Sequence, residues 1–297
     1  MTPIEITFPS NNIKLSGHLY VPNTYKKGDK LPAIVVLHPG GGVKEQTADL
    51  YAKELAGQGF ITLAFDRRTQ GASEGTPRHV EDPYCSVEDA KSAVTYLTLH
   101  EKVDTNRIGF LGICAGGGYA IAAASTDVRV KAIGAVSMVC VGALFTAIPK
   151  EALDGLIVQS GEARTEYAKT GEVKYLPYLP SIVQLTDDSP VLMKEGADYY
   201  LTPRGSHPRS VNKFALWSYD IITSYDSFAR IDRISPRPLL LIAGTDADTI
   251  EHSRQAFSRA SEPKELYTIE GATHIDLYDR KADKAAPKLT EFFKKHL

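Results

Sequence analysis

The spacing of apolar and polar residues changes repeatedly along the chain between short apolar runs and longer amphipathic segments. The apolar runs predict strands at 31–37, 60–65, 107–113, 132–139, 238–244 and 265–269. The amphipathic segments predict helices at 46–58, 87–100, 118–124, 253–260 and 282–296. Strands that alternate with helices of this length imply parallel crossovers, so we expect an α/β fold with a doubly wound, mostly parallel sheet.

Two other regions depart from this alternation. Near the N-terminus, alternating runs at 4–8 and 13–20 flank a Pro-Ser-Asn-Asn turn signal and predict a β-hairpin. Between 141 and 233 the sequence is rich in tyrosine and proline and shows no strand periodicity. We therefore expect one core domain, formed by 1–140 and 234–297, that carries an inserted, mostly helical cap at 141–233.

Composition and charge narrow the class of protein. The 297 residues, of which 43% are hydrophobic, suffice for a sizeable core, and a formal net charge of −2 gives no electrostatic footprint for nucleic acid or an anionic membrane. No apolar stretch approaches the ~20 residues that span a bilayer, and the N-terminus lacks the pattern of a secretory signal. Three cysteines without metal-ligand spacing favour a reducing compartment. We expect a cytoplasmic protein without metal, nucleic-acid or membrane partners, and its oligomeric state, a homodimer included, stays open.

One short stretch carries candidate chemistry. Gly112-Ile113-Cys114-Ala115-Gly116 joins a predicted strand to a predicted helix. A turn this sharp strains the residue at its apex, and the two glycines leave room for the crowded backbone. The side chain of Cys114 then projects from the carboxyl edge of the sheet, where the new helix points its free N–H groups and positive dipole end. We expect this setting to favour ionisation of the Cys114 thiol.

Polar residues follow the last two predicted strands. Asp246 and Asp248 come directly after one of them, and His274 comes directly after the next. Because the carboxyl ends of neighbouring parallel strands meet in one crevice, we expect these side chains to lie near Cys114. A nucleophile, an acid and a histidine in this chain order are the parts of a catalytic triad.

A glycine-rich turn, His38 to Gly42 (HPGGG), follows the first buried strand. Glycines there let the backbone approach a bound carbonyl group, so we expect the N–H of Gly41 or Gly42 to join that of Ala115 as an oxyanion donor. A phosphate-binding loop is disfavoured, because the GxGxxG and GxxxxGK spacings are both absent. His38 is interpreted as a loop residue that orients the turn.

The stretch around Cys114 is a GxSxG nucleophile elbow with cysteine in place of serine, and here the chain resembles the α/β-hydrolases. It is most similar to the dienelactone hydrolase-like group, whose elbow also carries cysteine followed by a Gly-Gly pair. The resemblance spans most of the chain outside 141–233 and implies an α/β-hydrolase fold with a triad of Cys114, Asp248 and His274. Related capped members favour the aspartate before Thr249, and a carboxylate further along the loop turns back more easily, so we choose Asp248 over Asp246.

Two departures limit what the resemblance implies. Dienelactone hydrolases carry a glutamate at the HPGGG turn that holds the thiol neutral, whereas this chain has His38 and Pro39. They also lack a cap of this size. The resemblance therefore points to the larger capped members, and dienelactone is not carried over as a substrate.

These features predict a hydrolase that cleaves an ester, lactone or thioester through an acyl-Cys114 intermediate, without a cofactor. An acyltransferase that passes the acyl group to an alcohol, and a non-catalytic ligand-binding protein on the same fold, stay open as alternatives. The tyrosines of 141–233, with Phe214 and Trp217, predict an aromatic, largely apolar pocket for a small-molecule acyl substrate. Amides are disfavoured, because the cysteine thiolate leaves the tetrahedral intermediate more readily than an amine does.

Overall fold

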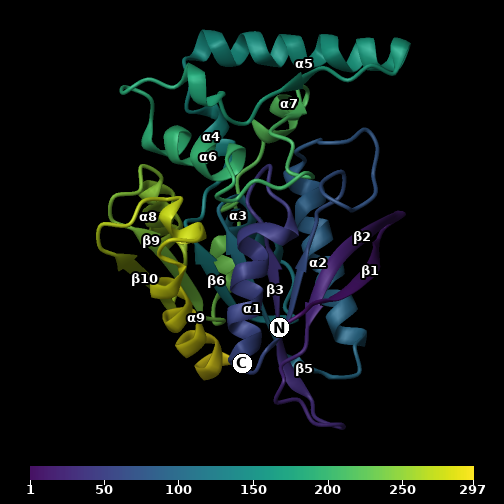
Figure 1. Ribbon diagram of the computed structural model, residues 1–297, viewed down its shortest axis with the longest axis vertical. Helices are drawn as coiled ribbons and strands as arrows, with labels where there is room; N and C mark the ends of the chain where they lie inside the picture. The colour runs from purple at the N-terminus through teal and green to yellow at the C-terminus, as the bar shows by residue number, and fades with distance from the viewer.

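The computed structural model describes all residues, 1–297, and an eight-stranded sheet forms its centre (Figure 1). The strands are β1 (Ile4–Ser10), β2 (Ile13–Tyr20), β3 (Leu31–Leu37), β4 (Ile61–Phe65), β5 (Val103–Ile113), β6 (Val130–Val136), β9 (Leu239–Gly244) and β10 (Lys264–Ile269). Their order in the sheet is β1-β2-β4-β3-β5-β6-β9-β10. β1 and β2 form an antiparallel hairpin, β2 is antiparallel to β4, and all other neighbours run parallel. The predicted hairpin and mostly parallel sheet are confirmed.

Helices cover both faces of the sheet. They are α1 (Asp49–Gly57) and α9 (Ala282–His296) on one face, and α2 (Pro83–Leu99), α3 (Ala115–Ala124) and α8 (Ile250–Arg259) on the other. In β3, Val35 and Leu37 pack into the core beneath α2 and α3, whereas Ile34 and Val36 pack into the core beneath α1 and α9. A strand that is buried on both faces needs apolar residues at every position, which explains the continuous apolar run in the sequence.

Every strand and helix predicted for the core forms, and the differences at their ends have local causes. α2 begins at Pro83, earlier than expected, because the Asp82 side chain accepts the N–H of Cys85 and caps the helix. β6 ends at Val136, earlier than expected, since Ser137 has a φ of 45°, which a strand does not accommodate.

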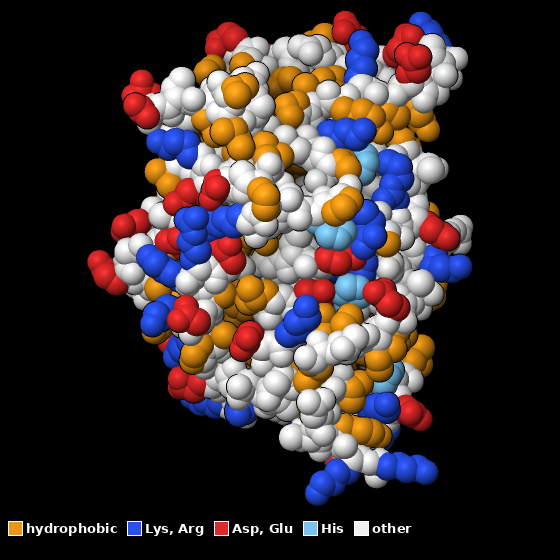
Figure 2. All heavy atoms as spheres, in the orientation of Figure 1, with side chains coloured by type: hydrophobic (Ala, Val, Ile, Leu, Met, Phe, Trp, Pro, Cys, Tyr) orange, Lys and Arg blue, Asp and Glu red, His pale blue; other side chains and the backbone are white.

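The segment 141–233, called the cap below, lies between β6 and β9 in sequence and at the top of the molecule in Figure 1. It contains α4 (Val141–Thr146), α5 (Lys150–Thr170), α6 (Val191–Leu201) and α7 (Ser218–Ile222), the short turns η2 (Ile182–Gln184) and η3 (Ile231–Ile234), and a ribbon of β7 (Tyr175–Leu176) and β8 (Phe214–Ala215). α5 runs along the outer surface, and only Ser160 and Ala163 of this helix are buried. Figure 2 shows apolar side chains gathered over the upper part of this face, above charged side chains of both signs.

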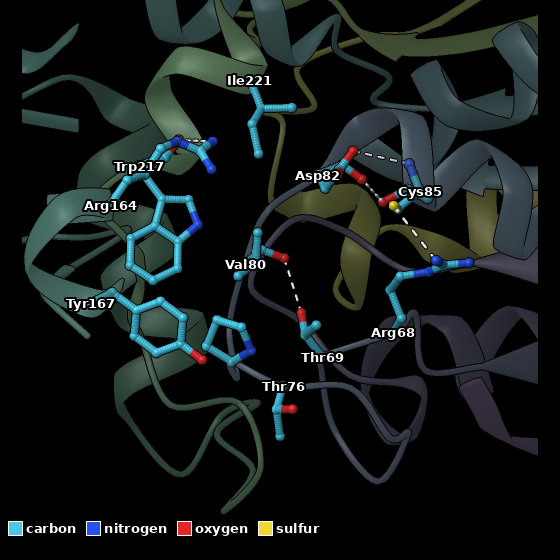
Figure 3. A pocket seen from close by; sticks show the side chains of 12 residues that line it. Arg68, Thr69, Thr76, Val80, Asp82, Cys85, Arg164, Tyr167, Trp217 and Ile221 are labelled. Atoms are coloured by element: carbon cyan, nitrogen blue, oxygen red, sulfur yellow. Dashed lines mark hydrogen bonds between the residues drawn. The ribbon is translucent and has the colours of Figure 1, made fainter. Parts of the chain in front are cut away.

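The cap and the loop after β4 enclose a cavity of about 390 Å³ (Figure 3). Trp217 and Tyr167 of the cap form one wall, with ring centroids 5.3 Å apart. Val80 and Cys85 line the cavity from the core. This cavity is one of the places where the cap rests on the core.

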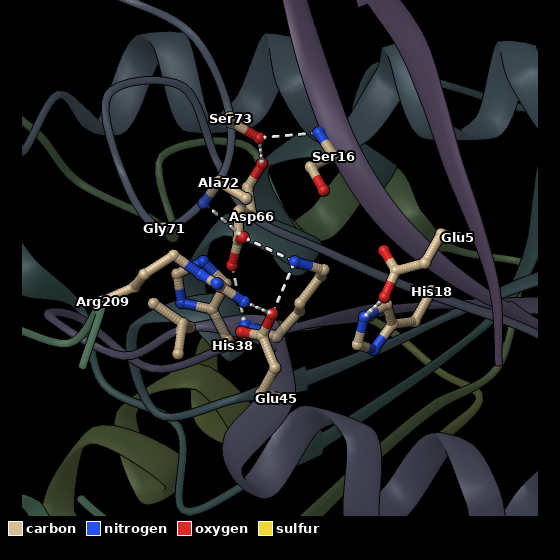
Figure 4. A network of polar contacts seen from close by, with 12 residues as sticks. Glu5, Ser16, His18, His38, Glu45, Asp66, Gly71, Ala72, Ser73 and Arg209 are labelled. Carbon is tan, nitrogen blue, oxygen red and sulfur yellow. Dashed lines mark hydrogen bonds and ion pairs between the residues drawn. The ribbon is translucent and has the colours of Figure 1, made fainter. Parts of the chain in front are cut away.

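A polar network ties the cap to the core at another place (Figure 4). Lys44, in a short π-helical turn η1 (Lys44–Ala48), is buried, and its Nζ lies 2.9 Å from Asp66 Oδ2 and 2.7 Å from Glu45 Oε1. Arg209 of the cap pairs with the same Glu45 carboxylate. Burial alone would raise the pKa of Glu45, but the Lys44 and Arg209 cations lower it to about 2. The network therefore stays charged at neutral pH.

Candidate active site

β5 turns sharply into α3 at Cys114, which has a φ of 54° and a ψ of −121°. A positive φ strains any residue except glycine and persists where the surroundings hold it. A Cβ atom on Gly112 would lie 2.2 Å from Gly116 O, and one on Gly116 would lie 2.4 Å from Leu37 O. Only glycine fits on either side of this turn, in agreement with the sequence pattern.

The Cys114 thiol is partly buried at the wall of a cavity. Burial raises its pKa above the ordinary value, although the Tyr278 hydroxyl and the N–H groups of Ala115 and Gly40 act to lower it. The expectation that the helix start ionises the thiol is therefore wrong for the resting protein. Loss of solvation outweighs the hydrogen bonds, and Cys114 is a neutral thiol at pH 7.

Two backbone N–H groups point at the Cys114 sulfur in the resting protein. They belong to Ala115, which is one of the predicted oxyanion donors, and to Gly40. The role predicted for the N–H of Gly41 or Gly42 toward a substrate oxyanion stays a prediction. The N–H of Gly42 is donated to Pro39 O at 3.3 Å, and this bond closes the HPGGG turn. The closed turn leaves the N–H of Gly40 free to face the sulfur.

Tyr178 of the cap packs on this turn. A Cβ atom on Gly41 would lie 2.8 Å from its ring, and its hydroxyl donates to Glu81 Oε2 at 2.6 Å. Glu81 is buried, pairs with Arg67 at 2.5 Å and accepts the Tyr119 hydroxyl at 2.5 Å. Burial opposes ionisation, but the Arg67 cation holds the pKa of Glu81 below its ordinary value. Glu81 is thus an ionised group with both oxygens paired.

His274 lies just after β10, and both of its ring nitrogens have partners. Nδ1 is 2.5 Å from Thr249 Oγ1, and Nε2 is 3.2 Å from the Tyr278 hydroxyl. The His274 carbonyl accepts the Ser137 hydroxyl at 3.0 Å, which fixes the backbone. Burial, with a smaller effect from His252, lowers the pKa of His274 to about 3. The imidazole is therefore neutral at physiological pH, as a general base must be.

Neither predicted acid is hydrogen-bonded to His274. Asp248 Oδ2 accepts the N–H of Leu192 at 3.0 Å, in the first turn of α6, and Asp246 Oδ1 accepts the hydroxyl of the preceding residue at 3.0 Å. A helix start attracts a carboxylate, because its N–H groups are free and its dipole end is positive. The cap thus holds Asp248, and Thr249 occupies the position beside His274 that the prediction gave to Asp248.

Two tyrosines border the thiol although the sequence patterns did not single them out. Tyr278 ends the short helix η4 (Asp276–Tyr278), and its hydroxyl faces both Cys114 and His274. Tyr200 comes from α6 and lies in the wall of the same cavity. The spacing of Tyr278 from His274 was the available signal, since side chains four residues apart in a helical turn lie on one side. Tyr200 is one of the tyrosines of 141–233 that were predicted to form the pocket, but no local signal distinguishes it from the others.

A cavity of about 590 Å³ joins Cys114 to the cap. Its walls are mainly apolar and include Leu144, Phe145, Leu192, Met193 and Phe214. No lysine or arginine lines it, and its two carboxylates, Glu81 and Asp248, are already paired. The cavity therefore suits an uncharged, largely apolar group.

No helix in the protein is both long enough and apolar enough to cross a membrane. No group of three or more His, Cys, Asp or Glu residues is arranged so that it could hold a metal ion.

Comparison with known proteins defines the class. Residues 29–281 match the family described as "Serine aminopeptidase, S33". The chain is 38% identical to the protein YcjY of Escherichia coli (strain K12), and the match covers 99% of each chain. The crystal structure of PA2218 from Pseudomonas aeruginosa is 37% identical and has a TM-score of 0.93, over 99% of this chain and 93% of that one. The chain belongs to this family and has the predicted α/β-hydrolase fold.

More distant relatives bear on the chemistry. Thiohydrolase aneE of Aspergillus aculeatus is 28% identical over 90% of this chain and 84% of its own length, and acyltransferase drtE of Aspergillus calidoustus is 28% identical over 92% and 88%. A dienelactone hydrolase from Anabaena variabilis is 16% identical with a TM-score of 0.59 over 100% of both chains. The predicted kinship with α/β-hydrolases is confirmed, but the resemblance to dienelactone hydrolases extends only to the fold.

Proposed function

We propose that this protein cleaves a carboxylic ester or thioester, with Cys114 as the nucleophile and His274 as the base. One observation carries the proposal: a thiol at a strained elbow has two backbone N–H groups aimed at its sulfur, and the Tyr278 hydroxyl beside it also contacts a buried, neutral imidazole. The thiohydrolase and acyltransferase among the relatives favour acyl chemistry.

Both groups are neutral at rest, so the proton must leave the thiol as the sulfur attacks. His274 is the base for this step, and the substrate carbonyl becomes a tetrahedral oxyanion on Cys114. The N–H groups of Gly40 and Ala115 then donate to the oxyanion. Each such donor contributes about 3 kcal/mol in studied acyl-transfer enzymes.

The protonated His274 next gives its proton to the leaving oxygen or sulfur, and the acyl group stays on Cys114. A water molecule, deprotonated by His274, attacks this thioester and releases the acid. The tetrahedral intermediate formed from an amide substrate would instead expel the Cys114 thiolate, because an amine leaves only after a well-placed acid protonates its nitrogen. Esters and thioesters are therefore the expected substrates.

We further propose that Cys114 and His274 act as a pair, with Thr249 as the residue that orients the imidazole. Thr249 Oγ1 lies 2.5 Å from Nδ1, and in the proposed tautomer it accepts the Nδ1–H and leaves Nε2 as the free base. In this proposal Asp248 fixes the start of α6 at the cavity wall. The predicted triad acid thus has a structural role.

The cap, 141–233, supplies most of the apolar cavity wall, and we propose that it forms the acyl pocket. Phe145, Met193 and Phe214 offer contact area to a hydrophobic acyl chain of modest size. An acyl group that carries its own carboxylate would meet no cation there. We therefore expect neutral acyl groups to be preferred over dicarboxylic ones.

A panel of chromogenic esters, acyl thioesters and matched anilides tests the proposal. Esters and thioesters should turn over and leave an acyl group on Cys114 that mass spectrometry detects, whereas anilides should not release product. The anilides matter most, because the name of the family refers to an aminopeptidase. Anilide cleavage at a rate similar to that of the esters would overturn the leaving-group argument.

Acyl transfer to an alcohol is the second candidate. It is favoured by the apolar cavity beneath the cap, which limits water around the acyl-enzyme, and by the similarity to acyltransferase drtE. Product analysis with and without acceptor alcohols separates the two: an ester product formed in preference to the free acid would establish transfer.

A further inference from the structure

The hydroxyl of Tyr278 stands between the two reacting groups of the proposed site. It lies 3.2 Å from Nε2 of His274, the nitrogen that must act as base, and it also faces the Cys114 sulfur. Cys114 and His274 form no direct hydrogen bond with each other, whereas nucleophile and base in known enzymes usually do. The thiol proton therefore has no direct path to the imidazole.

Tyr278 is held rigidly in this position. Its side chain is 1% exposed, and its ring packs against Tyr199 and His274 with centroid distances of 5.3 Å and 5.5 Å. Its carbonyl accepts the hydroxyl of Thr47 at 2.9 Å, which ties η4 to the segment before α1. Burial raises the pKa of Tyr278 well above its ordinary value, so the phenol keeps its proton. A rigid, neutral phenol is both a donor and an acceptor.

We propose that Tyr278 is a catalytic residue that relays the proton between Cys114 and His274. In the resting site the phenol O–H donates to Nε2, and the thiol S–H donates to the phenol oxygen. When the sulfur attacks, the phenol proton moves to Nε2 and the thiol proton moves to the phenol oxygen. The step breaks one S–H bond and one O–H bond and forms one N–H bond and one O–H bond, so the phenol is regenerated. The reverse transfer can return a proton toward the leaving group or the thiolate.

This inference rests on the proposed function, and Tyr278→Phe tests it, because this change keeps the ring and removes the relay. We expect kcat/KM for a chromogenic thioester to fall by about 10²-fold, the usual worth of proton transfer in catalysis, with KM nearly unchanged. Tyr199→Phe is the matched control, since Tyr199 packs beside Tyr278 but does not line the cavity. Its activity should stay near that of the wild type.

A second measurement distinguishes the relay from a merely structural role of Tyr278. The rate of acylation, followed by stopped flow in mixtures of H2O and D2O, should curve downward with two protons in flight in the wild type. Tyr278→Phe should give a linear dependence. A linear dependence in the wild type, or Tyr278→Phe with wild-type kcat/KM, would overturn the relay.

Variants of the proposed pair separate the two hypotheses. If Cys114→Ala and His274→Ala are inactive while Tyr278→Phe is fully active, the relay fails and the proposed function stands. If Cys114→Ala retains turnover, the proposed function fails, and the relay that rests on it fails too. Thermal melting of each variant checks that the fold is intact.

Discussion

Two cavities in this protein each contain a cysteine at the start of a helix. Cys114 precedes α3 and borders the cavity of about 590 Å³, and Cys85 lies in the first turn of α2 and borders the cavity of about 390 Å³ (Figure 3). Both cavities lie between core and cap, and aromatic residues line both. Position on a helix and access to a cavity therefore do not tell the two thiols apart.

The immediate neighbours of Cys85 and Cys114 distinguish the two thiols. The N–H of Cys85 donates to Asp82 at 3.0 Å, so a carboxylate already occupies the start of α2. Arg68 lies 3.6 Å from the Cys85 sulfur, but the same guanidinium pairs with Asp89 at 2.6 Å. Burial and the charge of Asp82 raise the pKa of Cys85 to about 11, and no histidine lines its cavity. Cys85 thus has neither a base nor free N–H groups for an oxyanion.

The comparison shows that a helix start does not by itself make a cysteine reactive. Cys114 has N–H groups of Gly40 and Ala115 beside its sulfur and a buried base nearby, and these are what acyl transfer requires. Its raised pKa is compatible with the proposed mechanism, in which the base removes the proton only when the substrate is attacked.

The largest effect should come from removing the two thiols one at a time. Cys114→Ala is expected to lower kcat for a thioester by about 10⁵-fold or more, as loss of a nucleophile does in other acyl-transfer enzymes. Cys85→Ala should leave kcat unchanged, because that thiol contacts no reacting group. Steady-state kinetics on both variants tests this difference between the two thiols. Turnover by Cys114→Ala would show that Cys114 is not the nucleophile.

A smaller loss is expected when the imidazole loses its orienting partner. Thr249→Val should lower kcat/KM by about 10²-fold, a typical cost of misplacing a catalytic group. Asp248→Asn should have far less effect, since an amide oxygen can still accept the N–H of Leu192 at the start of α6. Loss of a true triad carboxylate costs about 10⁴-fold in serine proteases, so a loss of that size in Asp248→Asn alone would restore Asp248 as the acid.

Alkylation compares the thiols without substrate. Iodoacetamide should label Cys114 on the order of tenfold faster than the other two cysteines, because Cys114 lines the larger cavity with two N–H groups beside its sulfur, whereas Cys140 is buried and the pKa of Cys85 is raised to about 11. The rate should still rise above pH 7, since the thiol is neutral at rest. Peptide mapping by mass spectrometry across pH 6 to 9 measures both. Equal labelling of the three cysteines, or a plateau below pH 7, is the contrary result.

A last effect, on stability and not on reactivity, concerns the surroundings of the Cys114 site, where two buried histidines stay neutral. Burial lowers the pKa of His38 to about 4 and that of His274 to about 3, against 6.5 in the unfolded chain. The unfolded state therefore binds more protons below pH 6.5, and stability falls as the pH falls toward 4. Between pH 7 and 5 the free energy of unfolding should drop by about 2 kcal/mol for each histidine. Urea denaturation at the two pH values measures it, and equal stability would show that these histidines are not held neutral.

Much of the core and part of the site were predictable because local patterns determine them. The strands that are buried on both faces appear as continuous apolar runs, and the glycines around Cys114 mark a turn that only they fit. His274 was identifiable because side chains at the carboxyl ends of parallel strands meet at one edge. These inferences needed only the neighbouring residues.

The remaining features depend on contacts between distant parts of the chain. The partner of Asp248 is the N–H of Leu192, 56 positions away in the cap, and no local pattern announces it. The N–H of Gly42 is used by a hydrogen bond to Pro39 O that closes the HPGGG turn, a contact that the glycine pattern alone does not reveal. The neutral state of Cys114 follows from its burial, which the sequence around the elbow does not reveal.

The burial of Cys114 also governs how the protein meets oxidants. Peroxides convert thiolates to sulfenic acids, and susceptibility follows both thiolate character and exposure. In the proposed mechanism Cys114 keeps its proton until a substrate carbonyl is in place, so the resting site would present no thiolate for such a reagent to attack. An acyl-transfer enzyme built in this way retains its nucleophile under oxidative conditions that inactivate cysteine enzymes with a preformed thiolate.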